Sequence, residues 1–245
     1  MLIYTLIPMM AAIAGAVIAV NVQPGPRAVS AFQHFAAGVV FAAAAGELLP
    51  ELMNQDSSLP ILIGGVLGIG ATWGIKALDH YYGEASSFIV SVLLDTLIDG
   101  LIIGMGFVAG AAQGFLLLFA LSLEVLFLGL ALTSSLAVRY SSAAIVGLSV
   151  VIGAMLPIGA SLGLMVGGLP PAVITAGYAF GLIALLYLVT EELLVEAHAH
   201  PDTPAITALF FVGFLMVVMV EHHVRMTIPG HGEAPRPAIE SPRTR

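Results

Sequence analysis

Two aspartates four residues apart, Asp95 and Asp99, lie in the middle of an apolar run from about residue 86 to residue 109. The run is long enough to cross a bilayer, which takes about 20 residues. On a helix this spacing places both carboxyl groups on one face, with their β-carbons about 5–6 Å apart. A charged side chain at the centre of a bilayer costs about 2.5–3.5 kcal/mol on insertion scales. The pair therefore indicates a functional site, which is stable when it is protonated or when a cation lies between the acids.

A third acid, Glu124, lies inside the next apolar segment, and neither segment contains a lysine or an arginine. Buried charges in proteins are paired, neutralised or bound to a metal, so protons and metal ions remain as partners here. We therefore predict that Asp95, Asp99 and Glu124 share one cation. The alternative is that each acid is protonated and hydrogen-bonded to a neighbouring helix.

Further acids and histidines lie nearer the ends of apolar segments, and we expect them to line a pathway to this site. They are Glu47, Glu51, Glu191, Glu192, Glu196, His198 and His200. The group from Glu196 to Asp202 could hold a metal transiently, or it could be a solvated loop. We interpret His34 as an ordinary interface histidine rather than a ligand. Thr96 and Ser122 could donate hydrogen bonds to the ligands, but we interpret them as helix-packing residues.

The composition defines the class of protein that must position these residues. Of the 245 residues, 59% are hydrophobic and only 9% are charged, whereas a soluble domain carries about 25% charged residues. The sequence therefore predicts an all-α integral membrane protein. It contains no cysteine, which excludes disulfides and thiolate metal sites. Its apolar start lacks a basic leading region, which predicts a first membrane helix and not a cleaved signal peptide.

Eight apolar segments form a predicted transmembrane domain over residues 1–225, and turns rich in proline, glycine or polar residues separate them. The remaining tail, residues 226–245, is rich in proline and polar residues, which predicts disorder. The expected helices span residues 2–21, 28–53, 59–80, 86–110, 112–138, 142–167, 172–198 and 204–224.

The basic residues predict the orientation of these helices. Arg27, Lys76 and Arg139 fall beside alternate loops, all on one side of the expected bundle. Since cytoplasmic loops carry an excess of lysine and arginine, we expect a multi-pass protein of the cell membrane with both termini outside. Four arginines near the C-terminus favour the opposite orientation, but most of them lie far from a helix end.

The ends of the second and seventh segments repeat a pattern. Glu47-Leu-Leu-Pro-Glu51 ends the second, and Glu192-Leu-Leu-Val-Glu196 ends the seventh. In an eight-helix topology these segments run in opposite directions, as an inverted repeat of helices 1–3 and 6–8 around a central pair would require. We predict that both line the route of the cation to its site, although leucine-rich helices also match by chance.

The motifs around these acids resemble those of the Zrt/Irt-like protein (ZIP) family of divalent-metal transporters. The fourth helix of that family carries His-Asn-Phe-Pro-Glu/Asp-Gly, to which Asp95-Thr96-Leu97-Ile98-Asp99-Gly100 is similar. Its fifth-helix motif, His-Glu-x-Pro-His-Glu, resembles Leu-Glu-Val-Leu-Phe-Leu at residues 123–128. The segments 34–51 and 187–196 are similar to its second and seventh helices. The resemblance covers most of the chain and implies eight helices, termini outside and a 3+2+3 inverted repeat.

The resemblance also implies a metal site on the fourth and fifth helices. Asp95 stands for the first histidine of the motif, Asp99 for a bridging carboxylate and Glu124 for an acidic ligand. Three further positions at which members carry ligands are apolar here: Leu123, Phe127 and Leu156. The implied site is three carboxylates that hold one ion. Oxygen ligands suit Mn²⁺, Fe²⁺ or Mg²⁺ as well as Zn²⁺, so zinc, or a similar ion such as cadmium, is implied by the resemblance alone.

We therefore expect a transporter of divalent metal cations and not an enzyme, with the metal as its substrate and no prosthetic group. Its expected partners are these cations and the lipid bilayer; a homodimer is compatible with the sequence, and nucleic acid is not expected. An intramembrane aspartyl protease is an alternative, but it needs catalytic aspartates on two helices. A proton- or sodium-coupled carrier of an organic solute would need a large polar site. A divergent member that binds metal or protons without transporting metal would carry the same acids.

Overall fold

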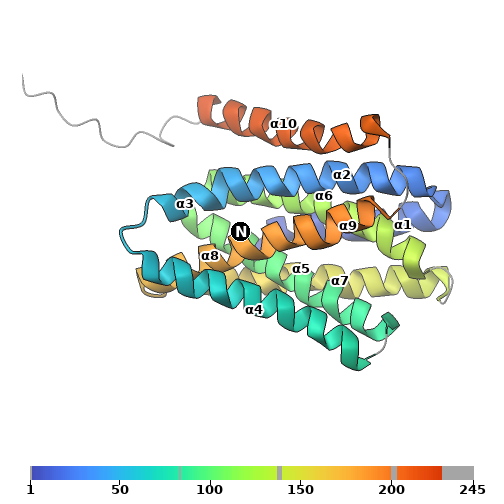
Figure 1. The fold of residues 1–245 in the computed structure, drawn as a ribbon, viewed down its shortest axis with the longest axis horizontal. Helices are drawn as coiled ribbons and strands as arrows, with labels where there is room; N and C mark the ends of the chain where they lie inside the picture. The colour runs from blue at the N-terminus through green and yellow to red at the C-terminus, as the bar shows by residue number, and fades with distance from the viewer. Residues whose placement is uncertain (1, 83, 137–139, 200–202, 228–245) are drawn as a thin grey trace, which may run out of the picture.

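The computed structural model describes residues 2–82, 84–136, 140–199 and 203–227 (Figure 1). Residues 228–245 of the predicted tail and the candidate pathway residue His200 lie outside this range. In the described part of the chain, all regular structure is helical and no strand occurs. Within these described residues, eight helical spans are long and apolar enough to cross a membrane, which confirms the predicted number. By these criteria the chain is a multi-pass membrane protein.

Three of the eight spans are composite. The first joins a short 3-10 turn, η1 (Leu2–Thr5), to α1 (Leu6–Val22). The second and seventh each contain a π-helical segment between two α-helices. The second consists of α2 (Pro26–Ala43), η2 (Ala44–Leu48) and α3 (Leu49–Met53). The seventh consists of α8 (Pro171–Tyr187), η3 (Leu188–Leu193) and α9 (Leu194–Ala197). The single helices are α4 (Ser58–Tyr82), α5 (Glu84–Ala109), α6 (Ala111–Leu136), α7 (Ser142–Val166) and α10 (Pro204–Thr227).

Local turn chemistry sets the helix ends, and the predicted boundaries agree within a few residues. Gln23 follows α1 in the left-handed backbone conformation, with φ at 48°. Helix α2 begins at Pro26, two residues earlier than predicted, because proline is pre-organised for the first helical position. Helix α7 begins after Ser141, whose hydroxyl oxygen accepts a hydrogen bond from the amide of Ala144 at 3.3 Å, as a capping serine does.

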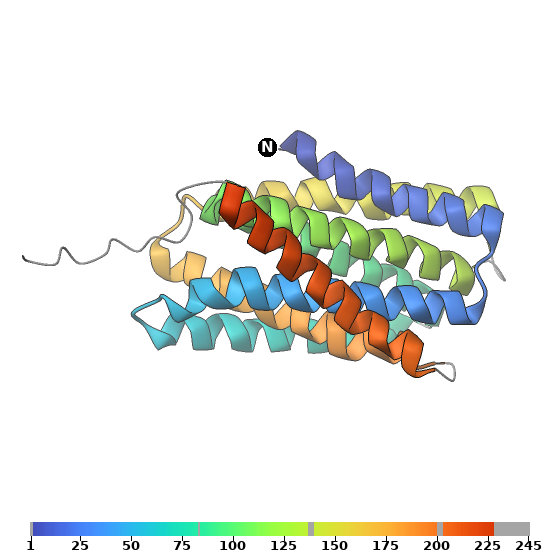
Figure 2. The ribbon, with the colours of Figure 1, turned by 90° about the horizontal axis from the view of Figure 1, so that it is seen from above.

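Consecutive spans alternate in direction and form one bundle (Figure 1). The most extensive pairings are α5 with α7, α1 with α6, α2 with α10, and α4 with α8. The spans built on α2 and α5 are the most buried, whereas α4 and α10 are the least buried. Helix α10 crosses α2 obliquely on the outside of the bundle (Figure 2). The candidate site residues of α5 therefore lie on a central helix.

Close backbone contacts fix the two helices that carry the candidate site. A β-carbon at Gly100, directly after Asp99, would overlap the backbone carbonyl of Leu156 on α7. In the same way, a β-carbon at Gly15 of α1 would overlap the carbonyl of Leu126 on α6. The hydrophobic effect does not drive helices together in lipid. Membrane helices instead associate where small residues permit close packing. Each acid-bearing helix is thus held against its own partner.

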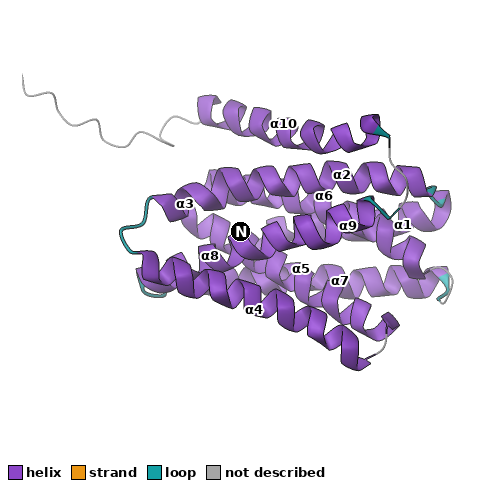
Figure 3. Ribbon diagram, in the orientation of Figure 1, coloured by secondary structure: helices purple, strands orange, loops and turns teal. Residues whose placement is uncertain are grey.

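The second and seventh spans lie side by side and run antiparallel. Gln33, near the start of α2, donates a hydrogen bond to a carboxylate oxygen of Glu196 on α9 at 2.7 Å. Thr175, near the start of α8, donates one to Gln55, which follows α3, at 2.9 Å. The two segments with the repeated Glu-Leu-Leu-x-Glu pattern, which end in α3 and α9, therefore lie at opposite ends of the bundle. These helices and their short connecting loops are distinguished in Figure 3.

Candidate metal centre

Asp95, Asp99 and Glu124 come together between α5 and α6. One carboxylate oxygen from each lies within 4.8 Å of those of the other two, and among the described residues this is the group of three or more acids and histidines that could hold a metal ion. Asp95 and Asp99 share one face of α5 because they are one helical turn apart. Glu124 joins them because α6 follows α5 after a single residue, Gly110, and packs back against it.

Two oxygens of this centre have no hydrogen-bond partner in the described part of the chain: Asp99 Oδ2 and Glu124 Oε2. Both side chains are 1% exposed, and Asp95 is half-buried. An unsatisfied buried polar group costs about 1–3 kcal/mol, and a charged one costs more. A cation between the carboxylates would satisfy both oxygens at once, and in the described part of the chain no hydrogen bond from a neighbouring helix reaches them.

The spacing of the three oxygens suits a single divalent ion. Oxygen ligands lie about 2.0–2.1 Å from Mg²⁺ and about 2.3–2.6 Å from Ca²⁺, and zinc–oxygen bonds are about 2.0–2.2 Å long. Three oxygens spread evenly around one such ion are therefore about 3.5–4.5 Å apart. The separation here needs at most a small inward movement of the side chains to bind an ion of this size.

Thr96 and Ser122, which are close to the central acids in the sequence, donate hydrogen bonds within their own helices. The hydroxyl of Thr96 donates to the carbonyl of Val92 at 2.7 Å, and that of Ser122 donates to Leu118. Each of these hydrogen bonds lies within the residue's own helix.

The apolar residues at the other ligand positions implied by the resemblance pack as core side chains. Phe127 lies against Phe32 and Phe35 of α2, with ring centroids 5.1 and 6.0 Å apart. Leu156 is fully buried and lies directly against Gly100, and Leu123 packs on the same core. The described centre therefore offers three carboxylates and no additional ligand at these positions.

A fourth acid, Glu192, lies close enough to the centre for its charge to act on Asp95, Asp99 and Glu124. It is half-buried on η3, whereas the adjacent Glu191 is exposed. The charge of Glu192 also acts on Glu196, one turn further along the same span. A line of carboxylates therefore leads from the centre toward the end of the bundle at α9.

The remaining predicted pathway residues divide between the two ends of the bundle. Glu47 is buried on η2, and Glu51 accepts a hydrogen bond from the amide of Gln113 at 3.3 Å. At the other end, Glu196 and His198 lie beside the start of α2, where His34 is buried against His198. Glu51, Glu196 and His198 thus contact residues of other helices near the two ends of the bundle.

The sequence analysis did not single out the two glutamines that hold the terminal glutamates. Gln33 binds Glu196, and Gln113 binds Glu51. Both glutamines lie inside apolar segments, and polar side chains within a membrane helix are a recognised sign of function. That signal was present, but nothing in the sequence indicates which acid each amide meets.

A search with models of protein families gives no match for this chain, and a search of curated proteins gives none either.

Proposed function

We propose that this protein transports divalent metal cations across the membrane, and that Asp95, Asp99 and Glu124 hold the ion in transit. The observation that carries the proposal is the convergence of three carboxylates from two helices inside a bundle of eight membrane-spanning helices. None of the seven lysines and arginines falls between residues 77 and 138. The three acids therefore have no basic residue on α5 or α6 to pair with, and a bound cation would take its place.

The ligand set supports a divalent ion that accepts oxygen. Three ionised carboxylates carry three negative charges. A divalent ion neutralises two of them, and one bound proton would neutralise the third. Carboxylates suit Mg²⁺ and Mn²⁺ and are also accepted by Zn²⁺ and Fe²⁺. We propose zinc or a similar transition-metal ion as the substrate, by the resemblance of the motifs to the ZIP family. The metal is cargo in this proposal and not a catalytic cofactor.

The helix pairings support a divergent ZIP-like architecture, with an inverted repeat of three helices on each side of the central pair α5 and α6. In such a repeat the first span (α1) corresponds to the sixth (α7), and the fourth (α5) corresponds to the fifth (α6). The pairing of α5 with α7 then corresponds to that of α6 with α1. The second span (α2) likewise corresponds to the seventh (α8), and the third (α4) to the eighth (α10). The pairing of α2 with α10 therefore corresponds to that of α8 with α4. The π-helical segments η2 and η3 fall in the two spans that this symmetry relates.

We further propose that the second and seventh spans line the route of the ion. An acid lies at the π-helical segment of each span: Glu47 on η2 is buried, and Glu192 on η3 is half-buried. Such segments are frequent at functional sites, since an inserted residue re-aims the side chains of one turn. The two terminal glutamates, Glu51 and Glu196, mark opposite ends of the route.

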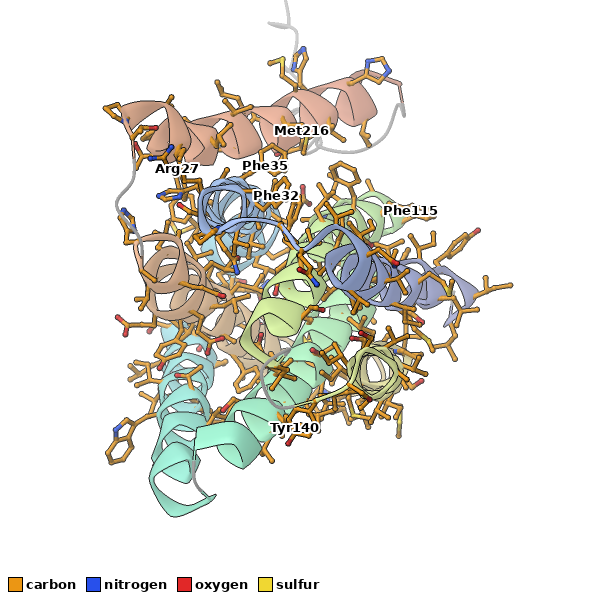
Figure 4. All side chains as sticks on the ribbon, turned by 90° about the vertical axis from the view of Figure 1, so that its right-hand side faces the viewer. Arg27, Phe32, Phe35, Phe115, Tyr140 and Met216 are labelled. Atoms are coloured by element: carbon orange, nitrogen blue, oxygen red, sulfur yellow. The ribbon has the colours of Figure 1, made fainter. Side chains whose placement is uncertain are left out.

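The orientation that we propose places both termini outside the cell. Arg27, at the start of α2, is exposed at one end of the bundle, where Figure 4 also labels Phe32 and Phe35 along α2 beneath α10. This end is cytoplasmic in the proposed orientation. The carboxylates of Glu192 and Glu196 then lead from the centre to the cytoplasm.

Uptake into proteoliposomes tests the function directly. Purified protein in sealed vesicles should take up Zn²⁺, Fe²⁺, Mn²⁺ or Cd²⁺ faster than empty vesicles do, and saturably. Asp99→Asn should abolish that uptake, because it removes a carboxylate from the shared site. The matched control is Asp56→Asn, which neutralises an exposed acid in the loop after α3 and should leave uptake unchanged. Uptake equal to that of empty vesicles for every ion would refute the proposal.

A further inference from the structure

Two histidines from different spans meet where the second span begins and the seventh ends. His34 lies on α2, and His198 directly follows α9. Their ring centroids are 4.8 Å apart, with an angle of 67° between the ring planes. His34 is 2% exposed, whereas His198 is exposed. The pair therefore extends from the interior of the bundle to its surface.

Both imidazoles are held by the same kind of contact. Nδ1 of His34 lies 3.0 Å from the carbonyl oxygen of Ser30, and Nδ1 of His198 lies 2.6 Å from that of Leu194. A carbonyl can only accept, so Nδ1 carries the proton in each ring and the lone pair is on Nε2. Histidines that bind metals almost always donate their other ring N–H in this way, which fixes the ring and its tautomer.

The separation of the rings fits ligation of one ion. Zinc–nitrogen bonds are about 2.0–2.1 Å long, and tetrahedral geometry would place the centres of two such imidazoles about 5 Å apart. The observed centroid distance of 4.8 Å is close to this value, so the rings are near enough to share one ion when both Nε2 atoms turn toward it.

Negative charge and a buried acceptor accompany the pair. Glu196, two residues before His198, accepts the amide hydrogen bond of Gln33 at 2.7 Å. The other end of that amide, Gln33 Oε1, is buried and has no hydrogen-bond partner in the described part of the chain. The contact of Gln33 with Glu196 and that of His34 with His198 therefore join α2 to the end of the seventh span at the same end of the bundle.

We propose that His34 and His198 form a second, transient site for a transition-metal ion at this end of the route, with Glu196 supplying negative charge. The proposal deepens the transport function above and rests on it. An imidazole pair favours Zn²⁺, Fe²⁺ or Ni²⁺ over Mg²⁺ and Ca²⁺, which prefer oxygen. The three central carboxylates discriminate little between these groups of ions. The histidine pair therefore supplies the selectivity for transition metals that the central acids lack.

The test is the amount of Zn²⁺ bound to the purified full-length protein at equilibrium dialysis. The His198→Ala variant should bind one Zn²⁺ fewer than the unchanged protein. The double variant Asp99→Ala/His198→Ala should bind one fewer than Asp99→Ala alone. His198→Gln, which is closer to histidine in size, should behave in the same way. His222→Ala is the matched control, because it removes an exposed histidine near the end of α10 and should lose no Zn²⁺.

Competition with Mg²⁺ separates the two sites. Excess Mg²⁺ should displace Zn²⁺ from the central acids, and the Zn²⁺ that remains should be lost in His198→Ala. Unchanged Zn²⁺ content in both His198 variants would overturn the histidine site and leave the central site standing. Loss of Zn²⁺ on His198→Ala, with no loss on Asp99→Ala, would support the histidine site and count against the proposed central one.

Discussion

At the scale of single residues, the two neighbouring glutamates of η3 occupy different environments. Glu192 is half-buried, and its charge acts on the three central acids, whereas Glu191 is exposed. The sequence placed both in one group of pathway residues, because a Glu-Glu dipeptide gives no indication of which side chain faces the interior. The structure shows that Glu192 is the more buried of the two. Substituting each glutamate in turn can therefore measure how much each one affects metal binding.

Neutralising Glu192 should weaken the binding of Zn²⁺ at the centre. Glu192→Gln removes a negative charge that attracts the ion, and at the intermediate dielectric of a partly buried site this should lower the affinity by about tenfold. Glu191→Gln is the matched control and should change the affinity by less than about twofold. Isothermal titration of both variants provides the comparison. Equal losses in the two variants would contradict the assignment of Glu192 to the ion's surroundings.

Protons should compete with the metal for the three carboxylates. A divalent ion needs them ionised, so binding should release protons, and the affinity should fall as the pH is lowered. Asp95→Asn leaves fewer carboxylates to titrate, and it should both weaken binding and flatten this dependence. Titrations between about pH 5 and pH 8, the range in which carboxylates at functional sites titrate, provide the test when done in buffers of different ionisation enthalpy. The same affinity throughout, without proton release, would disprove the competition.

At the scale of helices, the sequence predicted each span because long apolar runs end at proline, glycine or polar turns. It did not predict η2 and η3, since a π-helical turn shifts backbone hydrogen bonds and leaves no trace in the pattern of hydrophobic residues. The position of Glu192 depends on such a turn. The meeting of Asp95 and Asp99 was predictable from their spacing, and that of Glu124 from the short connection between α5 and α6.

The contact between α5 and α7 should depend on Gly100. Gly100→Ala would push a methyl group into the backbone of Leu156, and overpacking of this kind costs about 1–3 kcal/mol. The melting temperature in detergent should therefore fall, and Zn²⁺ affinity should fall with it, because Asp99 is adjacent. Gly147→Ala on α7 is the control: its β-carbon would meet nothing within 4 Å, so the better helix propensity of alanine should leave stability equal or slightly raised. Similar melting temperatures for both variants would argue against a tight contact at Gly100.

At the scale of the whole molecule, the number and order of the spans followed from the sequence, but their pairing did not. Apolar helix faces are interchangeable against lipid, so pairing is decided by where small residues permit contact. Glycines are frequent along this chain, and only the fold shows that Gly15 meets α6 whereas Gly100 meets α7. The sequence also suggested that the second and seventh spans run in opposite directions, and they do.

The orientation in the membrane can be tested with single cysteines, because the natural sequence contains none. Ser57, in the loop after α3, and Ser142, at the start of α7, are both exposed and lie at opposite ends of the bundle. With the termini outside, Ser57→Cys should react with an impermeant maleimide on intact cells. Ser142→Cys should react only after the membrane is permeabilised. The reverse labelling would invert the orientation and place the α9 end of the route outside.

The binding of Zn²⁺ to the purified protein tests the shared-cation site most directly. Isothermal titration is best done in the His198→Ala background, so that the histidine pair contributes no heat. The site formed by Asp95, Asp99 and Glu124 predicts one saturable Zn²⁺ per chain in that protein and none after the further change Asp99→Ala. An unchanged affinity and stoichiometry after Asp99→Ala would show that these three acids do not share a metal ion.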